Sequence, residues 1–377
     1  MLYISTLVPL LLSICLAMYI IPRILVVSTK KNLNIPPRHT DKGRRPVPRL
    51  GGVSLFPIIV ICVGVAVVSC LMQDKHLLLL EENDGTFVQY MFAIAGLTTM
   101  YLLGVMDDLI GVSLSWKLII EFLAALLIPL SGLWLDQLHG LLGIYELPYF
   151  LGMPFTVLTV MFIANTIPML DDVDGLASGM AMIAFSVLGV LSFIANQPFL
   201  LMICAAMVGM LLPFFFRNMM GWRIGWRNIY LGGTGGLTIG YMLSFVVIAL
   251  SRQGGYTLPD GIIMVCFGTL LIPMFDVLRV AVMRIVNHVS VFTRDNNHIH
   301  HRLMMGGMGA VGVLVTIIAV TSFFILLNVL GVWMNWNLSI LLVSNVALWL
   351  VLQVVISYYK NKNVSDNENE KDQEWII

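Results

Sequence analysis

The sequence contains few charged residues. Asp, Glu, Lys and Arg make up 11% of its 377 residues, whereas a soluble domain usually contains about 25%. Hydrophobic residues make up 59%, and they gather in runs of about 17–25 residues, the length that spans a bilayer as a helix. The shortage of charge excludes an ordinary soluble domain and predicts an integral protein of the lipid bilayer.

Two other signals are missing. The apolar run from Leu2 to Ile21 lacks a basic start and a small-residue cleavage site, so we expect a retained first span rather than a cleaved signal peptide. The five cysteines lie in apolar runs without a C-x-x-C pair, and we interpret them as buried small hydrophobic residues.

We expect no nucleic-acid partner.

The apolar runs predict eleven spans, and the connections between them alternate in charge. The spans are centred near residues 12, 62, 97, 126, 160, 186, 208, 241, 270, 320 and 348. Nineteen of the 21 Lys and Arg residues lie on one side, and only Lys75 and Arg252 lie on the other. The positive-inside rule makes the basic side cytoplasmic.

The predicted fold is therefore an all-α polytopic membrane protein with about 11 transmembrane helices. Its N-terminus lies outside and its C-terminus lies in the cytoplasm. Residues 1–359 form the membrane-embedded domain, and the polar residues 360–377 have too little apolar surface to fold, so we expect a disordered cytoplasmic tail.

The stretch 161–179, MFIANTIPMLDDVDGLASG, changes from apolar to acidic and holds Asp171, Asp172 and Asp174 within four residues. One ionised carboxylate in hydrocarbon costs at least about 2.5–3.5 kcal/mol, so this cluster should lie at a membrane–water boundary or in a wet cavity. A divalent cation and a phosphorylated substrate could meet there. If the helix continues through the cluster, Asp171 and Asp174 share one face, with Asn165 in the same region.

Two segments nearer the N-terminus lie on the same predicted face. Residues 36–52 carry Arg38 and Arg49 among prolines and glycines, which indicates a shaped loop that could hold phosphate oxygens. A basic loop that only sets topology is the alternative interpretation.

The second of these segments, residues 104–117, holds Asp107, Asp108 and Lys117. Neighbouring helical residues diverge by about 100°, so one carboxylate could face a cleft while the other caps a helix or orients a neighbour.

Two later segments complete this face. Asn218 lies at the exit of a span and is followed by the turn LGGTGG. This turn could present N–H groups to an anion or allow close helix packing. Residues 293–304 hold three histidines and two arginines. The other polar groups on this face suit Mg²⁺ rather than Zn²⁺, so we favour phosphate contacts for the histidines.

Taken together, the five segments resemble the polyprenyl-phosphate N-acetylhexosamine-1-phosphate transferases from about Arg38 to Arg302. The resemblance rests on five motifs in order: PVPRLGG, DDLIG followed by Lys117, the D-x-x-D-G-L-A run Asp171–Ala177, PFFFRN and HIHHRL. The HIHH form and the number of spans are more similar to the N-acetylglucosamine branch than to the muramoyl-pentapeptide branch.

The resemblance implies transfer of a sugar 1-phosphate from a UDP-N-acetylhexosamine to a polyprenyl phosphate, with release of UMP, at the cytoplasmic face of a bacterial inner membrane. It implies Mg²⁺, with Mn²⁺ as a substitute, and it is compatible with a homodimer. The candidate catalytic residues are Asp107, Asp108, Asp171 and Asp174, and the candidate metal ligands are Asp171 and Asn218. The candidate substrate-binding residues are Arg38, Arg49, Lys117, Asn165, Asn218, His298, His300, His301 and Arg302. The carboxylates either hold metal or orient and deprotonate the acceptor phosphate, and the sequence does not separate these roles.

Three positions differ from the family pattern. Gly233 stands where relatives have the aspartate that ligates Mg²⁺, Pro168 replaces an asparagine, and Asp172 replaces a glycine. A non-catalytic homologue that binds lipid or nucleotide, or partners an active enzyme, is therefore the alternative. A transporter is disfavoured, because the carboxylates cluster at one face and the spans show no inverted repeat.

Overall fold

The computed structural model describes residues 2–31, 33–35, 47–48, 50–73, 86–220, 229–290 and 297–374. The chain divides into two compact units, Met1–Phe267 and Gly268–Ile377. The strands among the described residues form only two short antiparallel pairs, and almost everything else is helical. The all-α prediction is confirmed.

The first unit is built from apolar helices that are connected by loops and turns. Its elements are α1 (Leu2–Lys30), β1 (Asn34–Ile35), β2 (Val47–Pro48), the 3₁₀ helix η2 (Leu50–Ser54), α2 (Leu55–Gln73), α3 (Thr86–Ile110), α4 (Leu114–Leu130), β3 (Gln137–Leu141), β4 (Ile144–Glu146), α5 (Tyr149–Leu170), α6 (Leu176–Ile194), α7 (Pro198–Met220), α8 (Gly232–Ser251) and α9 (Ile262–Gly268). Long apolar runs form helices in a bilayer because only a helix satisfies every backbone N–H and C=O within the segment.

The predicted spans coincide with helices. Ten of the eleven predicted centres fall inside a helix, and the centre near residue 270 falls at the break between α9 and α10 (Leu271–Val286). Within the described ranges, nine helices are long and apolar enough to cross a membrane, and ten if α9 and α10 form one broken span. The helix α4 has 17 residues, at the short end of the spanning range. The multi-pass membrane protein is confirmed, whereas the number eleven and the orientation stay predictions.

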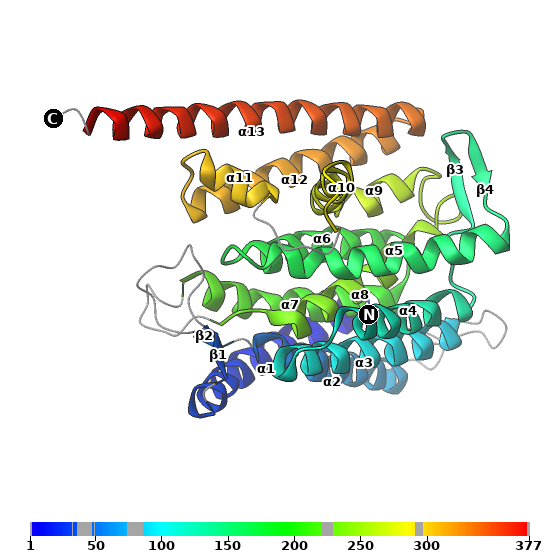
Figure 1. The fold of residues 1–377 in the computed structure, drawn as a ribbon. Helices are drawn as coiled ribbons and strands as arrows, with labels where there is room; N and C mark the ends of the chain where they lie inside the picture. Colours follow the sequence, from blue (N-terminus) through cyan, green and yellow to red (C-terminus); the bar gives the residue numbers. More distant parts are fainter. Residues whose placement is uncertain are drawn as a thin grey trace. The chain divides into compact units, whose positions relative to one another are not determined.

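Helix α8 lies at the centre of the first unit, packed against α3, α5 and α6 (Figure 1). Nearly all of its side chains are buried, whereas α1 and α4 expose large apolar side chains along one side. Small residues at the start of α8 let neighbouring backbones approach closely. This position makes the N-terminus of α8 a meeting point for segments that are far apart in the sequence.

The second unit contains α10, α11 (Ile299–Met305), α12 (Ala310–Trp333) and α13 (Leu338–Glu374). Helices α12 and α13 pack against each other and against α11. Two buried asparagines join the longer helices: Asn328 Nδ2 donates to Asn345 Oδ1 at 3.2 Å, and Asn345 Nδ2 donates to Asn328 Oδ1 at 2.8 Å. This reciprocal pair fixes the axial register of α12 and α13, because a shift of either helix would leave buried amides unpaired.

Candidate functional site

The N-terminus of α8 is held by a carboxylate from α3. Asp108 Oδ1 accepts the N–H of Gly233 at 2.9 Å, and Asp108 Oδ2 accepts the N–H and the hydroxyl of Thr234 at 2.8 and 2.7 Å. The first N–H groups of a helix have no partner within the helix and favour negative charge. Asp108 therefore caps a helix that begins more than a hundred residues later in the chain.

Close backbone packing makes this cap possible. A Cβ atom on Gly104 would lie 2.4 Å from Thr234 Cα, and a Cβ atom on Gly52 would lie 2.1 Å from Gly235 N. The N–H of Gly52 also donates to Leu231 O at 3.0 Å. The glycines of the first two motifs thus let η2 and α3 touch the start of α8.

Asp107 has a different environment from its neighbour. Its Oδ1 atom accepts the N–H of Val112 at 3.2 Å, and its Oδ2 atom forms a 3.2 Å ion pair with Lys117 Nζ. Both side chains remain partly exposed, at 19% for Asp107 and 21% for Lys117. A partly exposed carboxylate–ammonium pair can exchange partners more easily than Asp108, whose carboxylate accepts three hydrogen bonds from α8.

The acidic stretch also reaches α8. The buried carboxylate of Asp171 accepts the N–H of Gly232 through Oδ2 at 3.3 Å. The first three residues of α8 therefore donate their N–H groups to carboxylates of this protein. The sequence left two interpretations of the LGGTGG turn, anion binding and close helix packing. In the structure the N–H groups bind carboxylates of the protein itself, and the close packing is also present.

The prediction that Asp171 and Asp174 lie on one face of a continuing helix is wrong. Helix α5 ends at Leu170, and residues 171–175 form turns before α6. Pro168 lies in the last turn of α5, and Gly175 has φ +81°, a conformation that favours glycine. These two residues end one helix and redirect the chain, so a three-residue spacing does not place both carboxylates on one helical face.

Asn218 connects this turn to the segment before α8. Its Oδ1 atom accepts the N–H of Gly175, and its Nδ2 atom donates to Ile229 O at 2.7 Å. The side chain is almost fully buried, at 2% exposed. An amide oxygen has two acceptor sites, so Asn218 can order the turn and still offer an oxygen to a cation.

Glu121 of α4 is a site residue that the sequence reasoning missed. It is fully buried, and its Oε2 atom accepts a hydrogen bond from Asn165 Nδ2 at 2.5 Å. Its Oε1 atom has no hydrogen-bond partner among the residues that the structure describes. Glu121 also lies one helical turn after Lys117, so it extends the polar row inward from the exposed pair. The available signal was its position as the only charged residue in the apolar run 118–130, since an ionisable residue in a span marks a functional site by default.

The structure also gives the geometry around Gly233. A Cβ atom at this position would lie 3.2 Å from Asp108 Oδ1 and 3.3 Å from Asp107 Oδ2. A side chain at position 233 would therefore point toward both carboxylates of the D-D motif. The surrounding donors are carboxylate and amide oxygens, which suit a hard divalent cation.

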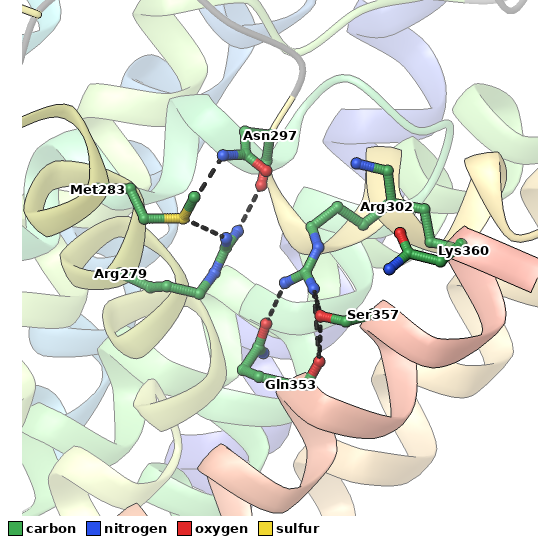
Figure 2. A pocket seen from close by; sticks show the side chains of 8 residues that line it. Arg279, Met283, Asn297, Arg302, Gln353, Ser357 and Lys360 are labelled. Carbon is green, nitrogen blue, oxygen red and sulfur yellow. Dashed lines mark hydrogen bonds between the residues drawn. The ribbon is translucent and has the colours of Figure 1, made fainter. Parts of the chain in front are cut away.

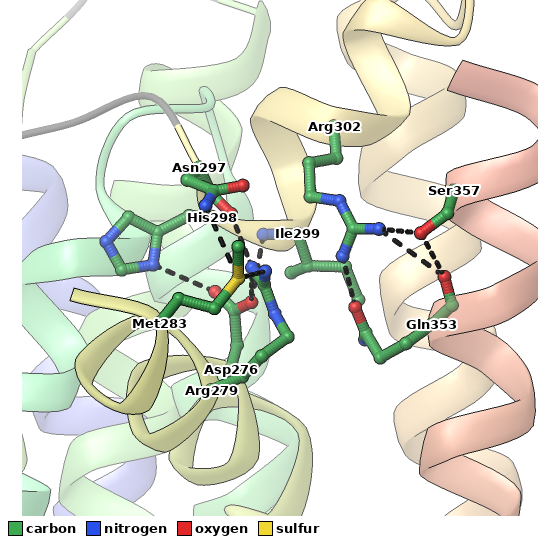
Figure 3. Close-up of polar contacts among 9 residues, drawn as sticks. All are labelled: Asp276, Arg279, Met283, Asn297, His298, Ile299, Arg302, Gln353 and Ser357. Atoms are coloured by element: carbon green, nitrogen blue, oxygen red, sulfur yellow. Dashed lines mark hydrogen bonds and ion pairs between the residues drawn. The ribbon is translucent and has the colours of Figure 1, made fainter. Parts of the chain in front are cut away.

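The histidine motif belongs to the second unit, where a second buried carboxylate organises it. Asp276 of α10 pairs with His298 Nδ1 at 2.9 Å, accepts from Arg279 at 2.9 Å and accepts the N–H of Ile299 at 3.1 Å (Figure 3). Asp276 was also missed, although it is the only acidic residue in the run 271–286. A carboxylate on one ring nitrogen fixes the orientation of the imidazole.

The other residues of this motif have separate environments. His300 is buried, and its ring is parallel to that of His298 at 5.8 Å between centroids. The ring of His301 lies 4.3 Å from that of His300. Arg302 turns toward α13, where it donates to the Gln353 side chain and to Ser357 Oγ.

The structure places most of the predicted residues in two groups. The first unit brings together Asp107, Asp108, Lys117, Asn165, Asp171 and Asn218 around the start of α8, with Asp174 in the adjoining turn. The second unit groups His298, His300, His301 and Arg302 on or next to α11. Arg38 and Arg49 lie outside the described residues.

Known proteins are similar in sequence to the part of the chain that contains this site. Residues 90–251 match the profile of a family described as glycosyl transferase family 4. A Bacillus subtilis (strain 168) protein named "probable undecaprenyl-phosphate N-acetylglucosaminyl 1-phosphate transferase" is 28% identical over 264 residues, which are 70% of this chain and 67% of that protein.

Two relatives carry the name "undecaprenyl-phosphate alpha-N-acetylglucosaminyl 1-phosphate transferase". The protein from Yersinia pestis is 24% identical over 311 residues, 81% of this chain and 78% of the relative. The protein from Escherichia coli (strain K12) is 24% identical over 287 residues, 74% of this chain and 71% of the relative. The segment that matches the glycosyl transferase family 4 profile, residues 90–251, contains the D-D motif, the acidic turn and the whole of α8.

Proposed function

We propose that this chain transfers N-acetylglucosamine 1-phosphate, or a related sugar 1-phosphate, from a UDP-sugar to undecaprenyl phosphate and releases UMP. The relatives' names support the transferred group, N-acetylglucosamine 1-phosphate, and the lipid acceptor, undecaprenyl phosphate. The reaction would be the first lipid-linked step of cell-surface polysaccharide synthesis, at the cytoplasmic face of a bacterial inner membrane.

The convergence at α8 is the observation that carries this proposal. Four of the five motifs reach the N-terminus of α8 or the three residues before it, through Gly52, Asp108, Asp171 and Asn218. Convergence of distant polar residues at one point of an apolar protein is expected of a reaction site rather than of a structural span.

Lys117 and Asp107 supply the exposed charge of this group. The donor diphosphate and the acceptor phosphate are both anionic, so positive charge is needed to bring them together. Lys117 can move from the carboxylate of Asp107, 3.2 Å away, to a phosphate oxygen. Asp107 is then released to orient the acceptor phosphate or accept its proton.

The fixed orientation of His298 suits a phosphate contact. Asp276 holds Nδ1, which leaves Nε2 as the ring nitrogen that would donate to a phosphate oxygen when the imidazole is protonated.

A divalent cation, Mg²⁺ or in its place Mn²⁺, fits the oxygen donors of the first unit. Asp171 and Asn218 would hold it, because a hard cation accepts carboxylate and amide oxygens and takes its remaining ligands from water and phosphate. Bound there, the cation would neutralise charge on the diphosphate. Two protein ligands imply weaker binding than in relatives that have an aspartate at position 233.

A non-catalytic homologue is the second candidate, and Gly233 is the observation that favours it. The missing carboxylate would point at Asp107 and Asp108, and Asp108 instead caps α8. A protein of this kind would bind the nucleotide or the lipid without turnover.

UMP release by the purified full-length protein tests the proposal. We expect release that requires UDP-N-acetylglucosamine, undecaprenyl phosphate and Mg²⁺ together, and loss of release in Asp107→Asn. Nucleotide binding without UMP release at any Mg²⁺ concentration would replace the proposal with the second candidate.

The orientation has its own test. Single cysteines are placed at Asp84 and at Thr293 in a background without native cysteines. The first should react with an impermeant label in intact cells, and the second should react only after the membrane is permeabilised. Reaction of both from outside would contradict the cytoplasmic assignment.

A further inference from the structure

The second unit contains a pocket of about 340 Å³ next to α11. It is an open pocket lined by side chains of α10, α11 and α13 and by Asn297, which precedes α11 (Figure 2). Its lining includes three basic residues and no acidic one: Arg279, Arg302 and Lys360, together with neutral polar side chains.

Within the described part of the chain, only one of these three positive charges forms an ion pair with a carboxylate. Arg279 forms a 2.9 Å ion pair with Asp276. Arg302 is 7% exposed, and its partners, Gln353 and Ser357, are neutral. Among the described residues, the Lys360 ammonium has neither a hydrogen bond nor an ion pair.

A buried guanidinium without a counter-ion is unusual, because buried charges are normally paired. Burial and the neighbouring Arg279 lower the pKa of Arg302 from its ordinary value, against an opposing effect of Asp276. The wall is also short of acceptors: Arg279 Nε and Gln353 Nε2 are buried without a hydrogen-bond partner in the part of the chain that is described. The pocket therefore matches an anion rich in acceptor oxygens.

The position on α13 indicates where such an anion comes from. Gln353, Ser357 and Lys360 are spaced by four and three residues, so they lie on one face of the helix. The exposed rings of Tyr358 and Tyr359 immediately precede Lys360, near the end of the apolar stretch Leu338–Asn363. Tyrosines next to a lysine at the end of a span are typical of the headgroup level of a bilayer.

We propose that this pocket binds the phosphate of an anionic membrane lipid. Basic pockets between membrane helices bind phospholipid headgroups, and a volume near the lower limit of ligand pockets, about 300 Å³, suits a headgroup. The acyl chains would extend into the bilayer that surrounds the span. Binding at this pocket does not depend on the transferase reaction.

Native mass spectrometry of the full-length protein, titrated with phosphatidylglycerol, tests this assignment. The variant Lys360→Gln should bind about fivefold more weakly, the effect of one basic residue near a membrane surface, and Lys360→Arg should bind as the wild type does. Lys362→Gln is the matched control, because Lys362 is exposed on the same helix and does not line the pocket. Thermal melts of each variant establish that the fold is retained.

Four results would overturn the proposal. Equal weakening by Lys362→Gln would mean diffuse attraction to the helix end, and unchanged binding in Lys360→Gln would mean that the pocket is not used. Equal binding of zwitterionic phosphatidylcholine would remove the argument from charge. Full competition by glycerol 3-phosphate, which has no acyl chains, would reassign the pocket to a water-soluble phosphate.

Discussion

Restoring a carboxylate at position 233 is the sharpest test of the site. Gly233→Asp would direct a third negative charge at Asp107 and Asp108, because a Cβ atom there lies 3.3 and 3.2 Å from their carboxylate oxygens. At about 4 Å and an effective dielectric constant of about 20, one pair of like charges repels by about 4 kcal/mol. The favourable effect of an acidic residue in the first turn of a helix is only about 0.3–1 kcal/mol. Without a cation, the variant should be less stable than the wild type.

A divalent cation should reverse this loss. If position 233 faces a cation site, Mg²⁺ would bind among the added carboxylate and its neighbours, and a ligand at a hundredfold excess over its Kd stabilises by about 2.7 kcal/mol. We therefore expect Mg²⁺ to raise the melting temperature of Gly233→Asp in detergent more than that of the wild type. UMP release should also need less Mg²⁺.

The matched control is Gly233→Asn, which has nearly the same shape and no charge. Both variants must displace the neighbouring carboxylates slightly, so a steric effect would be common to them. If Gly233→Asp and Gly233→Asn melt alike with and without Mg²⁺, position 233 does not face a cation site, and the reasoning is refuted.

Three further predictions concern neighbouring residues. Asp171→Asn should lower kcat far more than Asp136→Asn, because Asp136 makes only a partly exposed ion pair with an arginine, worth about 0–1 kcal/mol; equal turnover in the two variants would remove Asp171 from the site. Glu121→Ala should cost about 1–3 kcal/mol by removing the hydrogen bond between its buried carboxylate and the half-buried amide of Asn165, whereas Glu121→Gln should melt within a few degrees of the wild type; equal melting of the two would contradict this role. Gly104→Ala should sharply reduce the yield of folded protein, whereas Gly64→Ala, whose added Cβ meets nothing within 4 Å, should not; equal yields would contradict the close contact of α3 with α8.

The sequence was sufficient to predict the helices, because a long apolar run in a bilayer has few other ways to satisfy its backbone. The motifs were also visible as polar residues in an apolar chain. Asn165 and Asn218 were named from these patterns. Asn165 donates a hydrogen bond to the buried Glu121, and Asn218 joins the acidic turn to the segment before α8.

Partners distant in the sequence could not be predicted. Asp108 and Gly233 are 125 residues apart, and no local pattern identifies which helix a carboxylate will cap. The prediction that Asp171 and Asp174 share a helical face was wrong for a local reason. Pro168 and Gly175 turn the chain where the prediction continued the helix.

The cap on α8 also constrains how the protein is assembled. A chain synthesised from its N-terminus produces Asp108 long before the N–H groups that it will bind. Until α8 is made, the carboxylate of Asp108 lacks these protein donors. Helices insert first and associate afterwards, and arrival of α8 supplies the missing donors and fills the centre of the first unit together. A chain truncated before α8 would therefore lack the central helix of the first unit, and the carboxylate of Asp108 would lack its N–H donors. We expect such a fragment to be recognised as incomplete and degraded.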